Sequence, residues 1–202
     1  GPDSTDTIPF RQRPRPTNAE ATNIVVTEYS VPRGGKRELY MLRGDRRFVW
    51  PHDVIVNDRY AYYTDHFSYM LGRVDLKSGE AVEMPFSLPT GAGRGNRPDD
   101  GRPGDPGGGA QELEFDGHGN VIVGMDNGTV KYDPKTGKFM AWSAGSPMFG
   151  VDPQGNVWNM RRNGELIKLD TSSPQLKPVT YLIPKNGGIY DMDTDSKGRT
   201  HL

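Results

Sequence analysis

The chain repeats itself, and this internal repetition constrains its fold more than any single residue does. Each copy has the same order: an apolar stretch, a turn, a second apolar or aromatic stretch, a third stretch ending at Asp, a glycine turn and a fourth stretch. Three copies are complete and a fourth begins; they cover 51–84, 110–142, 146–184 and 187–202. The third stretches end at Asp75, Asp133 and Asp170, which are 58 and 37 residues apart. Without a Gly/Pro-rich insert in the first interval, both spacings approach the roughly 40-residue period of a four-stranded β-blade.

The apolar stretches have the composition of strands. They are short, rich in β-branched and aromatic residues, and bounded by Gly, Asp, Asn or Pro, as in VIVND, YAYYTD, NVIVG and ELIKLD. No segment of a dozen residues shows helical apolar spacing without a Pro or Gly. An isolated blade cannot bury both of its faces, so the blades must pack face to face. The sequence therefore predicts an all-β chain, a β-propeller of four-stranded antiparallel blades with about three full blades and partial ones.

The segments outside the copies suggest how the chain is divided. Residues 1–22 carry prolines without apolar periodicity and are predicted to be a disordered tail or linker. The blades occupy 23–202, with the Gly/Pro-rich loop at 90–109 between two of them. Val26–Val31 is expected to be an orphan outer strand. Either the chain is a fragment of a larger ring, or this strand joins residues 188–202 to close a small ring of four blades.

Composition excludes several classes of function. The charges nearly cancel, with 25 Lys and Arg against 26 Asp and Glu, so a nucleic-acid partner is not expected. The absence of cysteine excludes disulfides, thiolate metal sites and cysteine nucleophiles. No apolar run is long enough for a membrane span. A periplasmic or secreted location is slightly favoured, because a chain without cysteine tolerates an oxidising compartment and the start at Gly1-Pro2 resembles a processed end.

Several motifs resemble those of the virginiamycin B lyase (streptogramin B lyase) type of β-propeller. They are Pro51-His52-Asp53-Val54, Tyr62-Tyr63-Thr64-Asp65, Leu71-Gly72-Arg73-Val74-Asp75 with Gly79, and Thr27-Glu28-Tyr29-Ser30-Val31-Pro32. The resemblance covers about residues 25–202. It implies a channel that binds a small cyclic or ester-containing molecule. It also implies a His acting as general acid or base, and a Glu that helps to hold Mg²⁺ while a Cα proton is removed and an ester C–O bond breaks. His52 stands at the position of that His, and Asp65 is the nearest substitute for the Glu.

Candidate site residues follow from the position of the channel. In a propeller, the residues leading into each innermost strand and leaving each second strand line one mouth of the channel. The candidates there are His52 and Asp65 for catalysis, and His66, Glu112, Arg161 and Tyr190 for ligand binding. The alternative for His52 is a ring that caps the channel or bonds to a neighbouring turn. Asp191 and Asp193 alternate with Asp195 along one strand, a pattern that suits Mg²⁺ or Ca²⁺; alternatively, these carboxylates belong to a turn and to backbone caps.

Two functions remain open from the sequence. The first is a virginiamycin B lyase-like propeller that binds a small molecule at the channel mouth and performs metal-assisted elimination. The second is a non-catalytic propeller segment of a larger exported protein, used for recognition or assembly. The expected partners are accordingly a small-molecule ligand, and another copy of the chain or the rest of a larger propeller.

Overall fold

The structure is a computed structural model, and it describes the chain in eight stretches. These are residues 25–31, 50–66, 68–89, 109–125, 128–160, 164–175, 177–183 and 192–201. Within them the only regular elements are β-strands, and no described helix is long and apolar enough to cross a membrane. The predicted tail at 1–22 and the insert up to residue 108 lie outside the described residues.

The described strands form four antiparallel sheets that follow the chain, as the repeat predicts. Blade 1 is β1 (Pro51–Val56), β2 (Tyr60–Asp65), β3 (Met70–Asp75) and β4 (Ala81–Pro85). Blade 2 is β5 (Ala110–Phe115), β6 (Val121–Met125), β7 (Gly128–Asp133) and β8 (Lys138–Trp142). Blade 3 is β9 (Phe149–Val151), β10 (Val157–Met160), β11 (Glu165–Leu169) and β12 (Val179–Leu182). Blade 4 is described by two strands, β13 (Asp193–Thr194) and β14 (Thr200–His201).

Repeated aspartates fix the turns between the first two strands of blades 2, 3 and 4. In blade 2, Oδ1 of Asp116 accepts the backbone N–H groups of His118 and Asn120 at 2.9 and 2.8 Å. Gly119 follows with φ of 84°, which a residue with a Cβ adopts only with strain. The same arrangement recurs at Asp152 with Gly155 and at Asp195 with Gly198. These turns thus combine a left-handed glycine with bonds from the aspartate side chain to backbone N–H groups.

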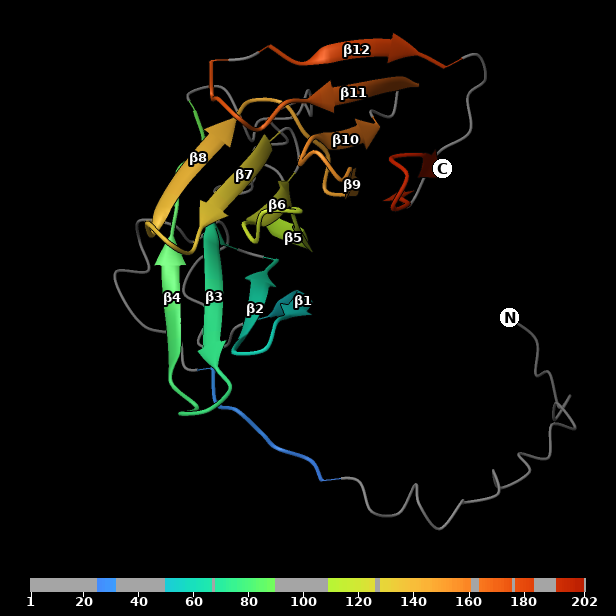
Figure 1. The fold of residues 1–202 in the computed structure, drawn as a ribbon. Helices are drawn as coiled ribbons and strands as arrows, with labels where there is room; N and C mark the ends of the chain where they lie inside the picture. Colours follow the sequence, from blue (N-terminus) through green and yellow to red (C-terminus); the bar gives the residue numbers. More distant parts are fainter. Residues whose placement is uncertain are drawn as a thin grey trace, which may run out of the picture.

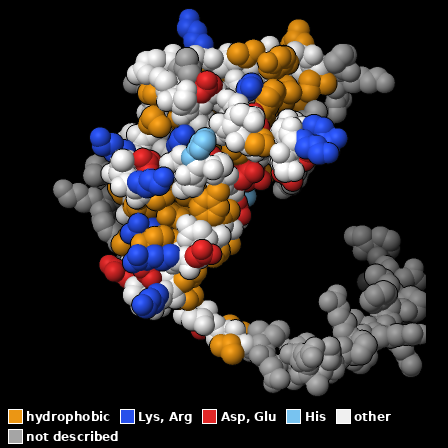
Figure 2. Space-filling view, viewed as in Figure 1, with side chains coloured by type: hydrophobic (Ala, Val, Ile, Leu, Met, Phe, Trp, Pro, Cys, Tyr) orange, Lys and Arg blue, Asp and Glu red, His pale blue; other side chains and the backbone are white. Residues whose placement is uncertain are grey.

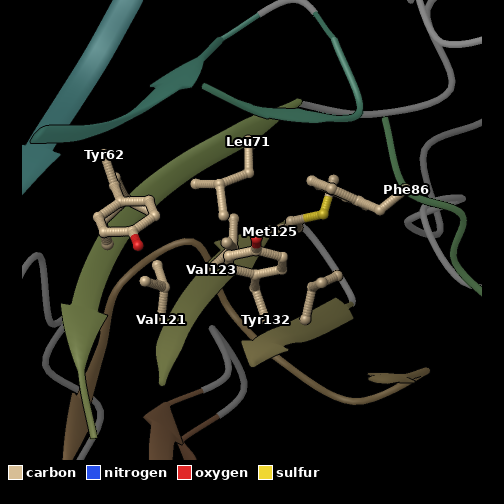
Figure 3. Packing of buried hydrophobic residues seen from close by; sticks show 10 residues of the cluster. Tyr62, Leu71, Phe86, Val121, Val123, Met125 and Tyr132 are labelled. Carbon is tan, nitrogen blue, oxygen red and sulfur yellow. The ribbon is translucent and has the colours of Figure 1, made fainter. Parts of the chain in front are cut away.

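The hydrophobic core lies between the blades. Figure 3 shows Tyr62 and Leu71 of blade 1 directed toward Val121, Val123 and Met125 of blade 2. A second buried cluster joins blade 2 to blade 3 through Ile122, Trp142, Phe149, Val151, Val157 and Leu169. Burying a large apolar side chain is worth about 1.5–3 kcal/mol, so face-to-face stacking holds the blades together.

The blades follow one another around a common centre. Each innermost strand contacts the next, β1 with β5, β5 with β9, and β9 with β13. The sheets therefore form an arc with the innermost strands on its inner side (Figure 1). The space-filling view shows the same arc as a curved body with a hollow side (Figure 2). This is the radial arrangement of a β-propeller.

The segment 25–31 differs from its expected form, because it runs as irregular backbone and not as a strand. Its Tyr29 and Val31 pack on blade 1, against the cluster of Tyr63, Met70 and Val74. The hydroxyl of Tyr29 donates a hydrogen bond to the carbonyl of Leu76 at 2.9 Å. β13 and β14 instead adjoin β9, at the other end of the arc (Figure 1). Among the described residues, β13 and β14 form a sheet of their own without the segment 25–31, so the small ring in which this segment joins 188–202 is not formed there.

Candidate functional site

Strand register gathers the predicted mouth residues at one end of the blades. The start of β1 lies beside the end of β2, with Pro51 opposite Asp65. In blade 2, Ala110 lies opposite Met125 in the same way. The hydroxyl of Thr64 at the end of β2 donates to the carbonyl of Gln111 at the start of β5. The expectation that these positions share one end is therefore met in the described blades.

Two histidines form the centre of this end in blade 1. The rings of His52 and His66 are stacked, with centroids 5.0 Å apart and planes inclined by 16°. His52 is exposed and His66 is half-buried. The backbone holds them in place: the N–H of His66 donates to the carbonyl of Trp50 at 3.1 Å. Trp50 itself is 56% exposed. The structure thus brings together two of the residues that the sequence singled out.

Asp65, which is buried, bonds to the backbone next to this pair of histidines. Its side chain is fully buried, and Oδ1 accepts the backbone N–H of Trp50 at 3.3 Å. The turn after it is tied to blade 2, since Gly109 N–H donates to the carbonyl of His66 at 3.1 Å. Asp65 therefore positions the backbone that carries the two imidazoles. Its carboxylate is buried in the described structure.

Glu112 holds two blades together. Its Oε2 accepts the backbone N–H of Phe149, in blade 3, at 2.9 Å. Asp53 does the same one blade earlier: Oδ2 accepts Leu113 N–H, in blade 2, at 2.7 Å. Its Oδ1 accepts the N–H of the adjacent Val54 at 2.8 Å. We call these two inter-blade contacts the acid staples.

The acid staples bind the open edge of the innermost strands. β5 and β9 are each paired on one side only, with β6 and β10. Backbone N–H groups on the other edge of such a strand have no ladder partner, and a carboxylate of the preceding blade can bind them. The sequence contained the signal for this role. Asp53 and Glu112 both lie four residues before the turn residue of their copy, Asn57 and Asp116.

The described carboxylates of blade 4 do not fit a divalent cation. Oδ1 of Asp193 accepts the N–H of Thr194 at 2.7 Å. Oδ2 of Asp195 is bound by the guanidinium of Arg199, with Nε at 2.7 Å, and this contact lowers the pKa of Asp195 to about 2. Among the described residues there is no group of three His, Asp or Glu side chains that could hold a metal ion. Asp191, with Arg161 and Tyr190, lies outside the described residues.

A buried ion pair at the opposite, turn end of the blades was not anticipated. Nζ of Lys131 lies 3.2 Å from Oδ2 of Asp116, and the Asp116 side chain has no exposed surface. Lys131 also donates to the carbonyl and hydroxyl of Thr171 in blade 3. Burial raises the pKa of Asp116, but hydrogen bonds from Asn120, His118 and Lys131 outweigh it and lower the pKa overall. The pair links blades 2 and 3 on the side away from the histidines.

Comparisons with known proteins place the chain in no family. No family model and no curated protein matches the sequence. One similar solved structure is the extracellular domain of a hybrid two-component system from B. thetaiotaomicron. It has a TM-score of 0.45 and 14% identity, over 77% of this chain and 19% of that one. Another is a chain of the Mitotic Checkpoint Complex, with a TM-score of 0.42 and 12% identity, over 87% of this chain and 52% of that one. The chain thus spans about a fifth and about half of these two proteins' lengths.

Proposed function

We propose that the chain is a propeller that binds a small molecule at the mouth around His52 and His66. The stacked pair of imidazoles, 5.0 Å apart at the ends of adjacent strands, is the observation that carries this proposal. Imidazole is the side chain best suited to exchange a proton near neutral pH. Trp50, whose carbonyl accepts the N–H of His66, has an exposed apolar side chain of the kind that binds organic ligands.

The chemical class of the ligand is taken from the resemblance to virginiamycin B lyases. A cyclic peptide closed by an ester would present an acidic Cα–H and a leaving carboxylate. One imidazole would take the Cα proton, the freed electron pair would form a C=C bond, and the ester C–O bond would break to release the carboxylate. The second imidazole would donate hydrogen bonds to the charge that develops. The described acids provide no site for a divalent ion, so no step of the proposal passes through one.

The test uses a streptogramin B antibiotic as the probe. Binding would be measured by isothermal titration calorimetry, and ring opening by a change of retention in liquid chromatography with mass detection. His52→Gln and His66→Gln are each expected to weaken binding about tenfold or more, if each removes about 1.4 kcal/mol of interaction. His118→Gln is the matched control, because His118 is exposed in a turn at the opposite end of blade 2. The proposal is wrong if the unaltered chain does not bind the probe, or if all three variants bind it equally.

A further inference from the structure

Blade 1 has one face that no described blade covers. We call it the free face; it carries Val54, Val56, Tyr63, Met70 and Val74, from β1, β2 and β3. Its outer part is buried beneath Tyr29 and Val31 of the segment 25–31. Its inner part is open, with Val54 and Val56 each 57% exposed. The free face is therefore half covered, and what remains open is the surface of its innermost strand.

The repeat shows what such a face receives in the rest of the molecule. Counted back from the turn, Val54 and Val56 correspond to Leu113 and Phe115 in β5, and to Phe149 and Val151 in β9. Phe149 and Val151 are buried against Ile122 and Trp142 of the preceding blade. The N–H groups of Leu113 and Phe149 each bind an acid of the preceding blade, whereas that of Val54 binds its own neighbour, Asp53. β1 thus has the surface of a strand that packs against a preceding blade.

The opposite end of the arc offers the complementary piece. Blade 4 is described as two strands, β13 and β14, and β13 packs on β9 so closely that a Cβ on Gly150 would meet Oγ1 of Thr194 at 2.8 Å. Because side chains alternate along a strand, Asp193 and its partner His201 face away from blade 3. The outward side of β13 and β14 and the free face of blade 1 are thus the two ends of the described stack of blades.

We propose that a second copy of this chain docks head to tail on the free face. The β13–β14 pair of one copy packs on Val54 and Val56 of the other, beside the segment 25–31, which then becomes the outer strand of the shared blade. The contact continues the blade-to-blade interfaces already present within the chain. A head-to-tail contact forms a closed ring when its rotation closes, and two copies would close it with two identical contacts. Each copy supplies about four blades, so the ring has about eight, within the known range of propellers.

The experiment measures self-association of the full chain by sedimentation velocity and native mass spectrometry over the micromolar range. The unaltered chain is expected to form dimers. The double variant Val54→Asp with Val56→Lys, at exposed positions of the free face, is expected to weaken dimerisation at least tenfold. Asp193→Arg at the opposite end should weaken it similarly, and it tests the same contact if the first variant folds poorly. Leu182→Lys is the control: Leu182 is 82% exposed on the outer strand of blade 3, away from both ends of the arc.

Mixing the two weakened variants distinguishes a head-to-tail contact from other dimers. Each variant retains one intact end, so an equal mixture should recover a heterodimer held by a single contact. A dimer that joins identical faces would give no such recovery. The proposal is overturned by a chain that stays monomeric throughout the concentration range, by free-face variants that dimerise normally, or by a mixture that remains monomeric.

Discussion

Replacing Asp53 by Ala should destabilise the protein although no apolar contact is lost. The carboxylate of Asp53 accepts the N–H of Leu113 across the blade interface at 2.7 Å, and Leu113 is 4% exposed. When the carboxylate is removed, water cannot take its place as the acceptor, because this N–H is buried. Leaving a buried donor unsatisfied costs about 1–3 kcal/mol. The second bond, to the N–H of the exposed Val54, adds little because water can take its place.

The expected loss in the free energy of unfolding for Asp53→Ala is therefore about 2 kcal/mol. For a domain of this size, that corresponds to a fall in Tm of roughly 4–8 °C. Asp53→Asn keeps one acceptor oxygen but loses the charge that strengthens the bond, so about half of that loss is expected. Urea and thermal unfolding followed by circular dichroism would measure both variants, with Asp58→Ala, an exposed turn residue, as the control. A change below about 0.5 kcal/mol for Asp53→Ala would refute the role of the acid staple.

Three further predictions concern the turns and the buried ion pair. The pKa of Asp195 is about 2 in the folded chain and about 3.9 when unfolded, so its stabilisation is complete above about pH 4 and is lost as the pH falls toward 2. Urea midpoints between pH 5 and pH 2 should show that loss, and Asp195→Asn should reduce this part of the pH dependence. Lys131→Met leaves the Asp116 carboxylate buried without its cation and should cost about 3 kcal/mol in urea unfolding, with much of it recovered when Asp116→Asn is added. Gly155→Ala imposes a Cβ at φ of 80° and should lower stability by about 1–2 kcal/mol, and an unchanged Tm would contradict the assigned turn.

The sequence predicted the blades well because their signals are local. Strand composition, a turn Asp and a left-handed Gly recur within each copy, and each acts through bonds to its own neighbours in the chain. Asp116 with Gly119 illustrates this, since the whole turn is closed within five residues. The period of the copies then predicts the number of sheets without any knowledge of contacts between them.

Side-chain contacts that cross between blades could not be predicted from the sequence. Glu112 was expected at a ligand, but its partner is the backbone N–H of Phe149, 37 residues away. A side chain that binds a backbone N–H leaves no pattern in the partner's sequence, because every residue except proline carries that group. Likewise, Asp65 was expected to stand in for the Glu that helps to hold Mg²⁺, and its burial with a bond to the backbone N–H of Trp50 depends on how two strand ends meet. His52 and His66 were both expected at the channel mouth, and the hairpin that joins their strands brings their rings together.

The side-by-side stacking of the blades is tested most directly by amide hydrogen exchange, followed by NMR, at Leu113 and Phe149. The backbone N–H of each of these residues binds a carboxylate of the preceding blade. Both amides should be strongly protected in the unaltered chain. Asp53→Ala should lower protection at Leu113 far more than at Phe149. Rapid exchange at both positions in the folded chain would contradict the stacking of the blades.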